Sequence, residues 1–250
     1  MEYFRNFPRV DYKFGDEFEK SGGGDTIFEI THDLGAYVDI IDNVRQNASF
    51  YSQYHILEND RPDIVSQKIY GTPAYHWTFF MMNDNLREFG WPLSVNELDD
   101  KVKRDFPHQY IETRADLTGI FLVGERAVGA QSSGNGIILK RNLDIGTIVV
   151  DSPQPFQQGE QASVATYSGI TQAISVNATG FEYNMPRYYK NSSNEQVDID
   201  PAVGPGALLT EVTQYDHYVE ENDKLKTISV IRPDAINDIV GSYFQTMRAI

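Results

Sequence analysis

The chain has 250 residues, a formal net charge of −15 and no cysteine. The acidic excess argues against a nucleic-acid or anionic-membrane surface, and the lack of cysteine excludes disulfides, thiolate zinc sites and cysteine nucleophiles. With 40 % apolar and 12 % aromatic residues, the chain is predicted to be globular, with one large domain or about two to three small ones. No apolar run approaches the roughly 20 residues that span a bilayer, and the first ten residues resemble no signal peptide, so we expect synthesis in a reducing cytoplasm.

Residues 1–32 are predicted to form an N-terminal arm or short strands, because aromatic and polar positions alternate there. The aromatic and apolar positions are Tyr3, Phe4, Phe7, Val10, Tyr12 and Phe14, and the pattern breaks at the glycine-rich residues 21–25. A helix is predicted over 33–46 from the spacing of Leu34, Tyr37, Val38, Ile41 and Val44.

Residues 50–57 alternate like a strand, and residues 59–71 carry the start and stop signals of a helix. Asp60 is predicted as its N-cap, Pro62 suits its first turn, and Gly71 can end it in the left-handed conformation. Its buried stripe is predicted to consist of Ile64, Val65 and Ile69.

A second helix is predicted over 72–82, with Thr72 as its cap and Pro73 in its first turn. The helix is apolar nearly all round, which indicates burial on several sides. The residues responsible are Tyr75, Trp77, Phe79, Phe80, Met81 and Met82.

A third helix is predicted to start at a capping box of Ser94 and Glu97 and to end near Asp105. After Pro107 the composition changes. Residues 118–181 are rich in Gly, Ser, Val and Ile and contain short alternating runs, which predicts an all-β domain.

This β segment contains an internal repeat, since residues 121–142 and 156–177 align without gaps at an offset of 35. Two similar hairpins that bury their faces together predict a small sandwich or barrel. The identical pairs are Phe121/Phe156, Gly124/Gly159, Glu125/Glu160, Ala127/Ala162, Ala130/Ala165, Ser133/Ser168, Gly134/Gly169 and Asn142/Asn177.

Residues 182–210 have the composition of a linker, and residues 211–250 are predicted to form a helix–strand–helix docking segment. A polar helix around 211–223 precedes a strand at 225–231, and Pro233 opens the last helix. That helix has a narrow apolar stripe that needs a surface to dock on. The stripe consists of Ile236, Ile239, Val240, Tyr243, Phe244 and Met247.

The sequence contains no pattern typical of catalysis or of metal or cofactor binding. Its five histidines have no metal-ligand spacing, and its acidic clusters lack the spaced oxygen ligands of a calcium loop. The glycines of 124–136 do not form a phosphate-binding motif, and no nucleophile elbow occurs. We therefore predict no catalytic residue, no metal and no cofactor.

One candidate binding site remains, a shallow groove between the turn at 59–61 and the turn at 83–85. The structural alternative for Asn83 is a helix C-cap in the left-handed conformation, and for Trp77, Phe80 and Met81 it is burial in the core.

Residues 54–85, "YHILENDRPDIVSQKIYGTPAYHWTFFMMNDN", resemble a LysM-like module. The combination of "YG-x-P", a tryptophan and "NDN" is similar to the LysM-like part of one family, the baseplate wedge subunit encoded by the fifty-third gene of T4-type contractile-tailed phages. "YFRNFPRVDY" (3–12) and "YVEENDKLKTISVIRPDAINDIV" (218–240) resemble the start and end of that family. The β segment 118–181 is not part of the family's pattern.

The resemblance and the patterns above together predict an α+β chain: a helix and a LysM-like βααβ domain (33–107), an inserted small all-β domain (118–181) that the residue pattern alone predicts, and the C-terminal segment (211–250). The LysM-like core and groove would consist of Asp60, Ile64, Tyr70, Gly71, Trp77, Asn83 and Asn85. Contacts to partners would involve Phe4, Phe7, Tyr12, Lys224, Lys226, Ile236, Val240, Phe244 and Met247.

The resemblance also implies the function, a non-enzymatic virion protein that joins or clamps baseplate wedges and is assembled in the host cytoplasm. Its expected partners are other wedge proteins and neighbouring wedges, and neither nucleic acid nor membrane. The alternative is a peptidoglycan-binding LysM module on the tail tip, with weak glycan binding in the groove. A third hypothesis is a cell-wall-degrading enzyme that uses Glu58 or Asp60 as its acid.

Overall fold

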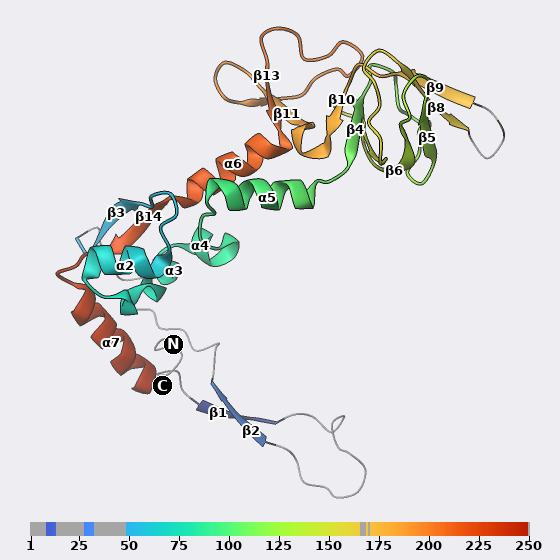
Figure 1. The fold of residues 1–250 in the computed structure, drawn as a ribbon. Helices are drawn as coiled ribbons and strands as arrows, with labels where there is room; N and C mark the ends of the chain where they lie inside the picture. The colour runs from blue at the N-terminus through green and yellow to red at the C-terminus, as the bar shows by residue number, and fades with distance from the viewer. Residues whose placement is uncertain (1–8, 14–27, 33–48, 166–168, 170, 250) are drawn as a thin grey trace, which may run out of the picture. The chain divides into compact units, whose positions relative to one another are not determined.

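The computed structural model divides the chain into two compact units (Figure 1). Residues 1–92 and 223–250 form unit 1, and residues 93–222 form unit 2. With 31 % helix and 29 % strand, the prediction of an α+β fold is confirmed. The residues that the structure describes are 9–13, 28–32, 49–165, 169 and 171–249.

The first two strands of unit 1 form an antiparallel pair, so short strands, one of the two forms predicted for the N-terminal residues, occur at residues 9–13 and 28–32. β1 (Arg9–Lys13) pairs with β2 (Phe28–His32) along their whole length. The glycine-rich residues 21–25 and the predicted helix at 33–46 lie outside the described residues.

The centre of unit 1 is a two-stranded antiparallel sheet of β3 (Tyr51–His55) and β14 (Thr227–Ile231). Its strands come from opposite ends of the unit, and Gln53 lies opposite Ser229. The unit's helical elements are α2 (Pro62–Tyr70), the 3-10 turn η3 (Pro73–Tyr75), α3 (Trp77–Met82), α4 (Asp84–Phe89) and α7 (Ile236–Ala249). The chain of unit 2 runs between α4 and β14.

The predicted signals around α2 are partly confirmed. Pro62 occupies the first helical position, and Gly71 ends the helix in the left-handed conformation with φ 72°. Asp60 is not the N-cap; that position belongs to Arg61, whose side chain makes no capping hydrogen bond. The helix predicted over 72–82 is broken into η3 and α3, although Thr72 does cap the first turn by accepting from the Ala74 amide.

The prediction for the buried stripe of α2 is wrong at one position. Val65 is fully buried and Ile69 partly buried, but Ile64 is 45 % exposed. Ser66 is buried instead, and its hydroxyl donates to the Thr72 carbonyl oxygen at 2.7 Å. These helices cover one face of the sheet, in a core cluster of Ile56, Val65, Phe79, Leu86, Ile228 and Val230.

The apolar stripe of α7 packs inside unit 1. Ile236 and Val240 are buried in a cluster with Trp77, Met81, Met82, Ile231 and Tyr243. The expectation that these two residues need a partner protein to cover them is therefore wrong, because α3 of the same chain covers them.

Unit 2 begins with α5 (Val95–Asp105) and ends within α6 (Gln214–Leu225). The predicted capping box of Ser94 and Glu97 is present. The Asn222 side chain accepts from the Leu93 amide at 2.8 Å and donates to the Leu93 carbonyl oxygen at 3.0 Å. Entry to and exit from unit 2 are thus hydrogen-bonded to each other.

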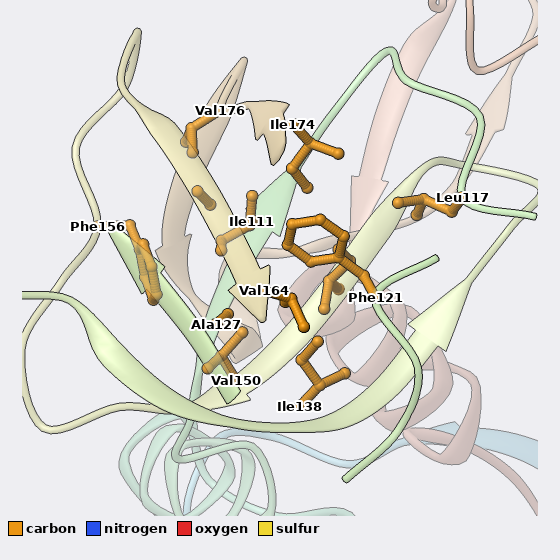
Figure 2. Packing of buried hydrophobic residues seen from close by; sticks show 12 residues of the cluster. Ile111, Leu117, Phe121, Ala127, Ile138, Val150, Phe156, Val164, Ile174 and Val176 are labelled. Atoms are coloured by element: carbon orange, nitrogen blue, oxygen red, sulfur yellow. The ribbon is translucent and has the colours of Figure 1, made fainter. Parts of the chain in front are cut away.

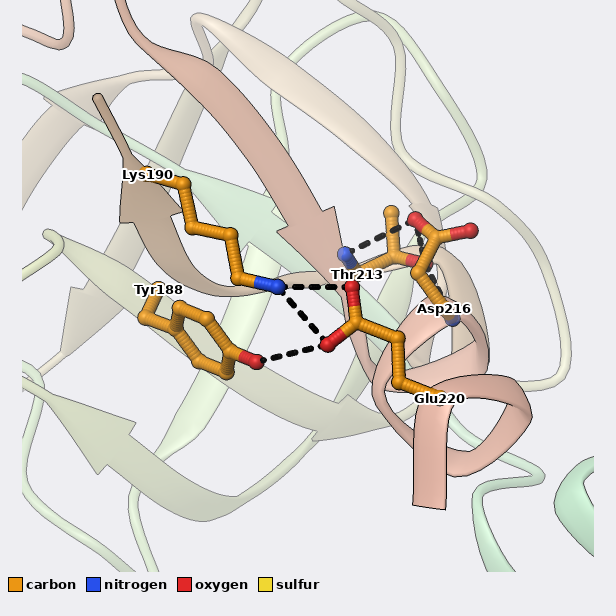
Figure 3. A network of polar contacts seen from close by, with 5 residues as sticks. All are labelled: Tyr188, Lys190, Thr213, Asp216 and Glu220. Carbon is orange, nitrogen blue, oxygen red and sulfur yellow. Dashed lines mark hydrogen bonds and ion pairs between the residues drawn. The ribbon is translucent and has the colours of Figure 1, made fainter. Parts of the chain in front are cut away.

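A polar network fixes the first turns of α6 (Figure 3). Thr213 and Asp216 form a reciprocal capping box at its start. One turn further, the Glu220 carboxylate accepts two hydrogen bonds of 2.7 Å from Lys190 and one of 3.4 Å from the Tyr188 hydroxyl.

The seven-stranded sheet of unit 2 closes into a barrel, one of the two predicted forms. Its strand order is β10-β4-β7-β6-β5-β8-β9, all antiparallel. The two end strands are consecutive parts of one segment, residues 171–181: its first half pairs with β8 and its second half with β4. One apolar cluster fills the interior (Figure 2). The strands are β4 (Gln109–Glu112), β5 (Arg126–Gly129), β6 (Asn135–Asn142), β7 (Thr147–Asp151), β8 (Gln161–Ala165), β9 (Thr171–Ser175) and β10 (Ala178–Phe181).

The sequence repeat corresponds to two hairpins, β5–β6 and β8–β9, but only its first half is structurally equivalent. Phe121 and Phe156 are both buried, and Gly124 and Gly159 share a positive φ of 91° and 86°. In the first hairpin the Gly124 amide donates to the Ile138 carbonyl oxygen, 14 residues later in the chain. In the second hairpin the Gly159 amide donates to the Val176 carbonyl oxygen, 17 residues later. The second hairpin is therefore three residues longer, and the identities Gly134/Gly169 and Asn142/Asn177 are not structural matches, while Ser168 lies outside the described residues.

The prediction of a linker over residues 182–210 is wrong. These residues contain a 3-10 turn η4 (Glu182–Asn184) and the strands β11 (Pro186–Lys190) and β12 (Gln196–Val197). With β13 (Thr210–Thr213) they form a three-stranded sheet in the order β12-β11-β13. Tyr189, in the central strand, is almost fully buried, so this segment is part of the folded unit.

Candidate functional site

The predicted groove between the two turns is only partly present, because its acidic residue is already paired. The Asp60 carboxylate accepts from Lys68 Nζ at 2.7 and 2.6 Å, a hydrogen bond that raises the pKa of Lys68. The Asp60 carbonyl oxygen accepts from the Trp91 indole at 2.7 Å. Before it, Asn59 adopts a positive φ of 65° and is exposed, which fixes the tight turn after β3.

Asn83 is buried, and its side chain is fully used inside the protein. Its φ and ψ of −128° and 107° are extended, so the predicted left-handed cap is wrong. Its Oδ1 accepts from the Ser229 amide at 2.8 Å, and its Nδ2 donates to the carbonyl oxygens of Ser229 and Phe79 at 2.9 and 2.8 Å. Asn85, half-buried, accepts from the Leu86 amide within α4. Asn83 is therefore not available to a ligand.

Two other predicted core residues, Trp77 and Tyr70, are packed within unit 1. Trp77 is buried, with its ring 5.3 Å from that of Tyr243 and 5.7 Å from that of Phe244. The Tyr70 hydroxyl donates to the Ile231 carbonyl oxygen at 2.8 Å, and burial raises the pKa of this phenol well above its usual value. The prediction that Trp77 belongs to the core is confirmed.

The predicted partner-contact residues differ in their surroundings. Lys224 is exposed near the end of α6, and Lys226 forms an ion pair of 2.7 Å with Asp223. Phe244 is half-buried against Trp77. Phe4 and Phe7 lie outside the described residues, as do the side chains of Tyr12 and Met247.

Sequence reasoning missed the role of Glu160, which is almost fully buried at the junction of the two repeats. Its carboxylate accepts from the amides of Gln131, Ser132 and Gln157 at 2.7 to 2.9 Å and from the Ser132 hydroxyl at 2.6 Å. Desolvation opposes ionisation, but these hydrogen bonds outweigh it and lower the pKa of Glu160 to about 2. The only signal in the sequence was the repeated Gly-Glu pair.

The described residues of unit 1 offer a surface for docking at the edge of its small sheet. Among them no three His, Asp or Glu side chains converge as metal ligands, and no helix is long and apolar enough to cross a membrane. Because the predicted groove residues are used inside the protein, the candidate docking surface of unit 1 is the sheet edge that β3 forms.

A scan against protein-family models and a search of curated proteins find no match to this chain.

Proposed function

We propose that the chain is a structural component of the baseplate wedge of a contractile-tailed phage, where it joins or clamps wedge subunits without catalysing a reaction. One observation carries the proposal in addition to the sequence resemblance. Strands β3 and β14 pair antiparallel, and helices α2 and α3 lie between them in the chain and pack on one sheet face. This arrangement supports a LysM-like βααβ unit in which α4 is an additional helix.

In this proposal unit 2 is a module inserted between helix α4 and the second strand of the LysM-like unit. The two hydrogen bonds between Asn222 and Leu93 support an insertion, because they hold the start and the end of unit 2 together. A barrel with an apolar interior of its own suits a module added to an assembly.

The same geometry favours assembly over glycan binding. A sugar-binding groove needs polar side chains free to exchange hydrogen bonds with the ligand. Asn83 is committed to the backbone of Phe79 and Ser229, and Asp60 to Lys68. We therefore propose that the LysM-like unit serves contacts with other wedge proteins.

A stop codon early in the gene tests this function in the phage that encodes it. We expect the mutant to produce heads but no complete baseplates, and a plasmid copy of the gene to restore them. The control is a synonymous change at the same codon, which should leave tails normal. Complete, infectious tails made without the chain would rule the proposal out.

A further inference from the structure

Strand β3 has one edge that points away from its partner. In the antiparallel pair, the Ile56 amide donates to the Lys226 carbonyl oxygen, and the Arg232 amide donates to the Phe50 carbonyl oxygen. Because inward and outward residues alternate along a strand, Ser52 and Tyr54 also face β14. The backbone groups of Tyr51, Gln53 and His55 therefore point outward, at the free edge of β3.

The opposite edge of the sheet is closed by side chains. The Asn83 side chain accepts a hydrogen bond from the Ser229 amide and donates one to the Ser229 carbonyl oxygen. The Tyr70 hydroxyl donates to the Ile231 carbonyl oxygen. Within the part of the chain that the structure describes, β3 pairs with β14 alone. Of the described strand edges in this sheet, the outward edge of β3 is thus the one open to a further strand.

The sequence of β3 lacks the features that usually protect an edge. Residues 50–56, "FYSQYHI", contain no lysine, arginine, aspartate or glutamate and no proline, and Phe50 is 41 % exposed. Natural sheets blunt free edges with charges, prolines or bulges, because a bare edge recruits another strand. Aromatic residues also favour an extended strand.

We propose that β3 pairs antiparallel with β3 of a second copy of this chain, about a two-fold axis at Gln53. Tyr51 then lies opposite His55 of the second copy, and all outward backbone groups of the strand gain partners in one register. The product is a four-stranded sheet whose outer edges are both closed by Asn83 and Tyr70. The interface is isologous and ends at two copies rather than forming a fibre.

Charge gives this pairing a distinctive salt dependence. Each copy carries a formal charge of −15, whereas the paired strands contain no lysine, arginine, aspartate or glutamate. Two copies repel each other over a distance of about one Debye length, and salt screens that repulsion. Self-association should therefore strengthen as salt is added, whereas docking to a basic partner would weaken.

Gln53→Pro is the decisive variant, because proline removes an outward amide that takes no part in the β3–β14 pairing. Gln53→Ala is the matched control: like the proline variant it loses the side-chain bond to Ser229, but it keeps the amide. We would measure sedimentation equilibrium of the full chain in about 50 mM and about 500 mM NaCl. We expect a dimer that tightens with salt, loses about tenfold or more in affinity with Gln53→Pro, and changes little with Gln53→Ala.

Amide exchange followed by NMR on the wild-type chain keeps the proposal testable should the proline variant not fold. Protection of the Gln53 amide should rise with protein concentration, while the Tyr54 amide is protected throughout. A chain that stays monomeric in both salts with an unprotected Gln53 amide overturns the proposal. A dimer whose affinity does not change with Gln53→Pro, or falls as salt is added, overturns the proposal as well. The inference does not depend on the proposed function, which the stop codon tests separately.

Discussion

The side chain of Asn83 pairs with the backbone of Ser229 as a neighbouring strand would. Its Oδ1 accepts from the Ser229 amide at 2.8 Å, and its Nδ2 donates to the Ser229 carbonyl oxygen at 2.9 Å. The residue that ends α3 thereby completes the edge of β14, and unit 1 is joined across 146 positions of the chain.

Replacing Asn83 by alanine should destabilise unit 1 by roughly 3 kcal/mol, because it leaves the partly buried amide and carbonyl of Ser229 without their side-chain partner. Both tryptophans of the chain, Trp77 and Trp91, belong to unit 1, so tryptophan fluorescence during urea unfolding reports on this unit. The control is Asn85→Ala, for which we expect a loss below about 1 kcal/mol. Equal losses for the two variants would contradict the assigned role of Asn83.

Replacing Glu160 by glutamine should destabilise unit 2 by roughly 3 kcal/mol at pH 7, because the neutral amide cannot accept all the hydrogen bonds of the carboxylate. The equivalent residue of the first repeat is the matched control. Glu125 accepts only from the Leu122 amide among the bonds seen here, so Glu125→Gln should cost less than about 1 kcal/mol. Unit 2 contains no tryptophan, so its unfolding is followed by circular dichroism.

The same carboxylate predicts how the stability of unit 2 depends on pH. Its pKa in the folded chain, about 2, lies below its unfolded value of 4.5, so its contribution is complete above about pH 4.5 and is lost as the pH falls towards 2. We expect the wild-type unfolding midpoint to drop over this range more steeply than that of Glu160→Gln. Parallel pH profiles for the two proteins would show that Glu160 is not the responsible group.

Truncating Tyr243 should destabilise unit 1, since its ring is buried and lies 5.3 Å from that of Trp77. We expect a loss of roughly 3 kcal/mol for Tyr243→Ala, measured by tryptophan fluorescence, and almost none for the exposed neighbour Gln245→Ala. A stable Tyr243→Ala variant would mean that α7 contributes little to the unit and is held mainly by partners.

Exchanging Leu122 and Val123 for glutamine should leave unit 2 as stable as before, within about 0.5 kcal/mol. These residues are 45 % and 61 % exposed, and the second repeat carries Gln157 and Gln158 at the same turn. The thermal midpoint from circular dichroism measures this. A large loss would mean that the apolar pair supports the barrel, in contrast to its counterpart.

Signals that act within one turn of the chain could be predicted from the sequence. The capping box at Ser94 and Glu97, the left-handed end at Gly71 and the strand at residues 50–57 depend only on neighbouring residues, and all are present. The linker at 182–210 was mispredicted because its average composition conceals the short strand Pro186–Lys190, whose Tyr189 packs in the interior.

The roles of Asn83 and Ser66 could not be predicted, because each depends on a backbone group that only the tertiary fold brings near. An asparagine after an apolar helix is usually a cap, and the strand that it completes here lies 146 residues away. The stripe of α7 was correctly recognised as apolar, but the sequence contains no information on whether α3 or another protein covers it.

Immunogold labelling of intact phage particles tests the central claim most directly. Antibodies raised against the purified chain should label the baseplate end of the tail, and particles from the stop-codon mutant should remain unlabelled. Gold on the head or the tail tube, or purified particles that lack the chain altogether, would contradict the assignment to the baseplate wedge.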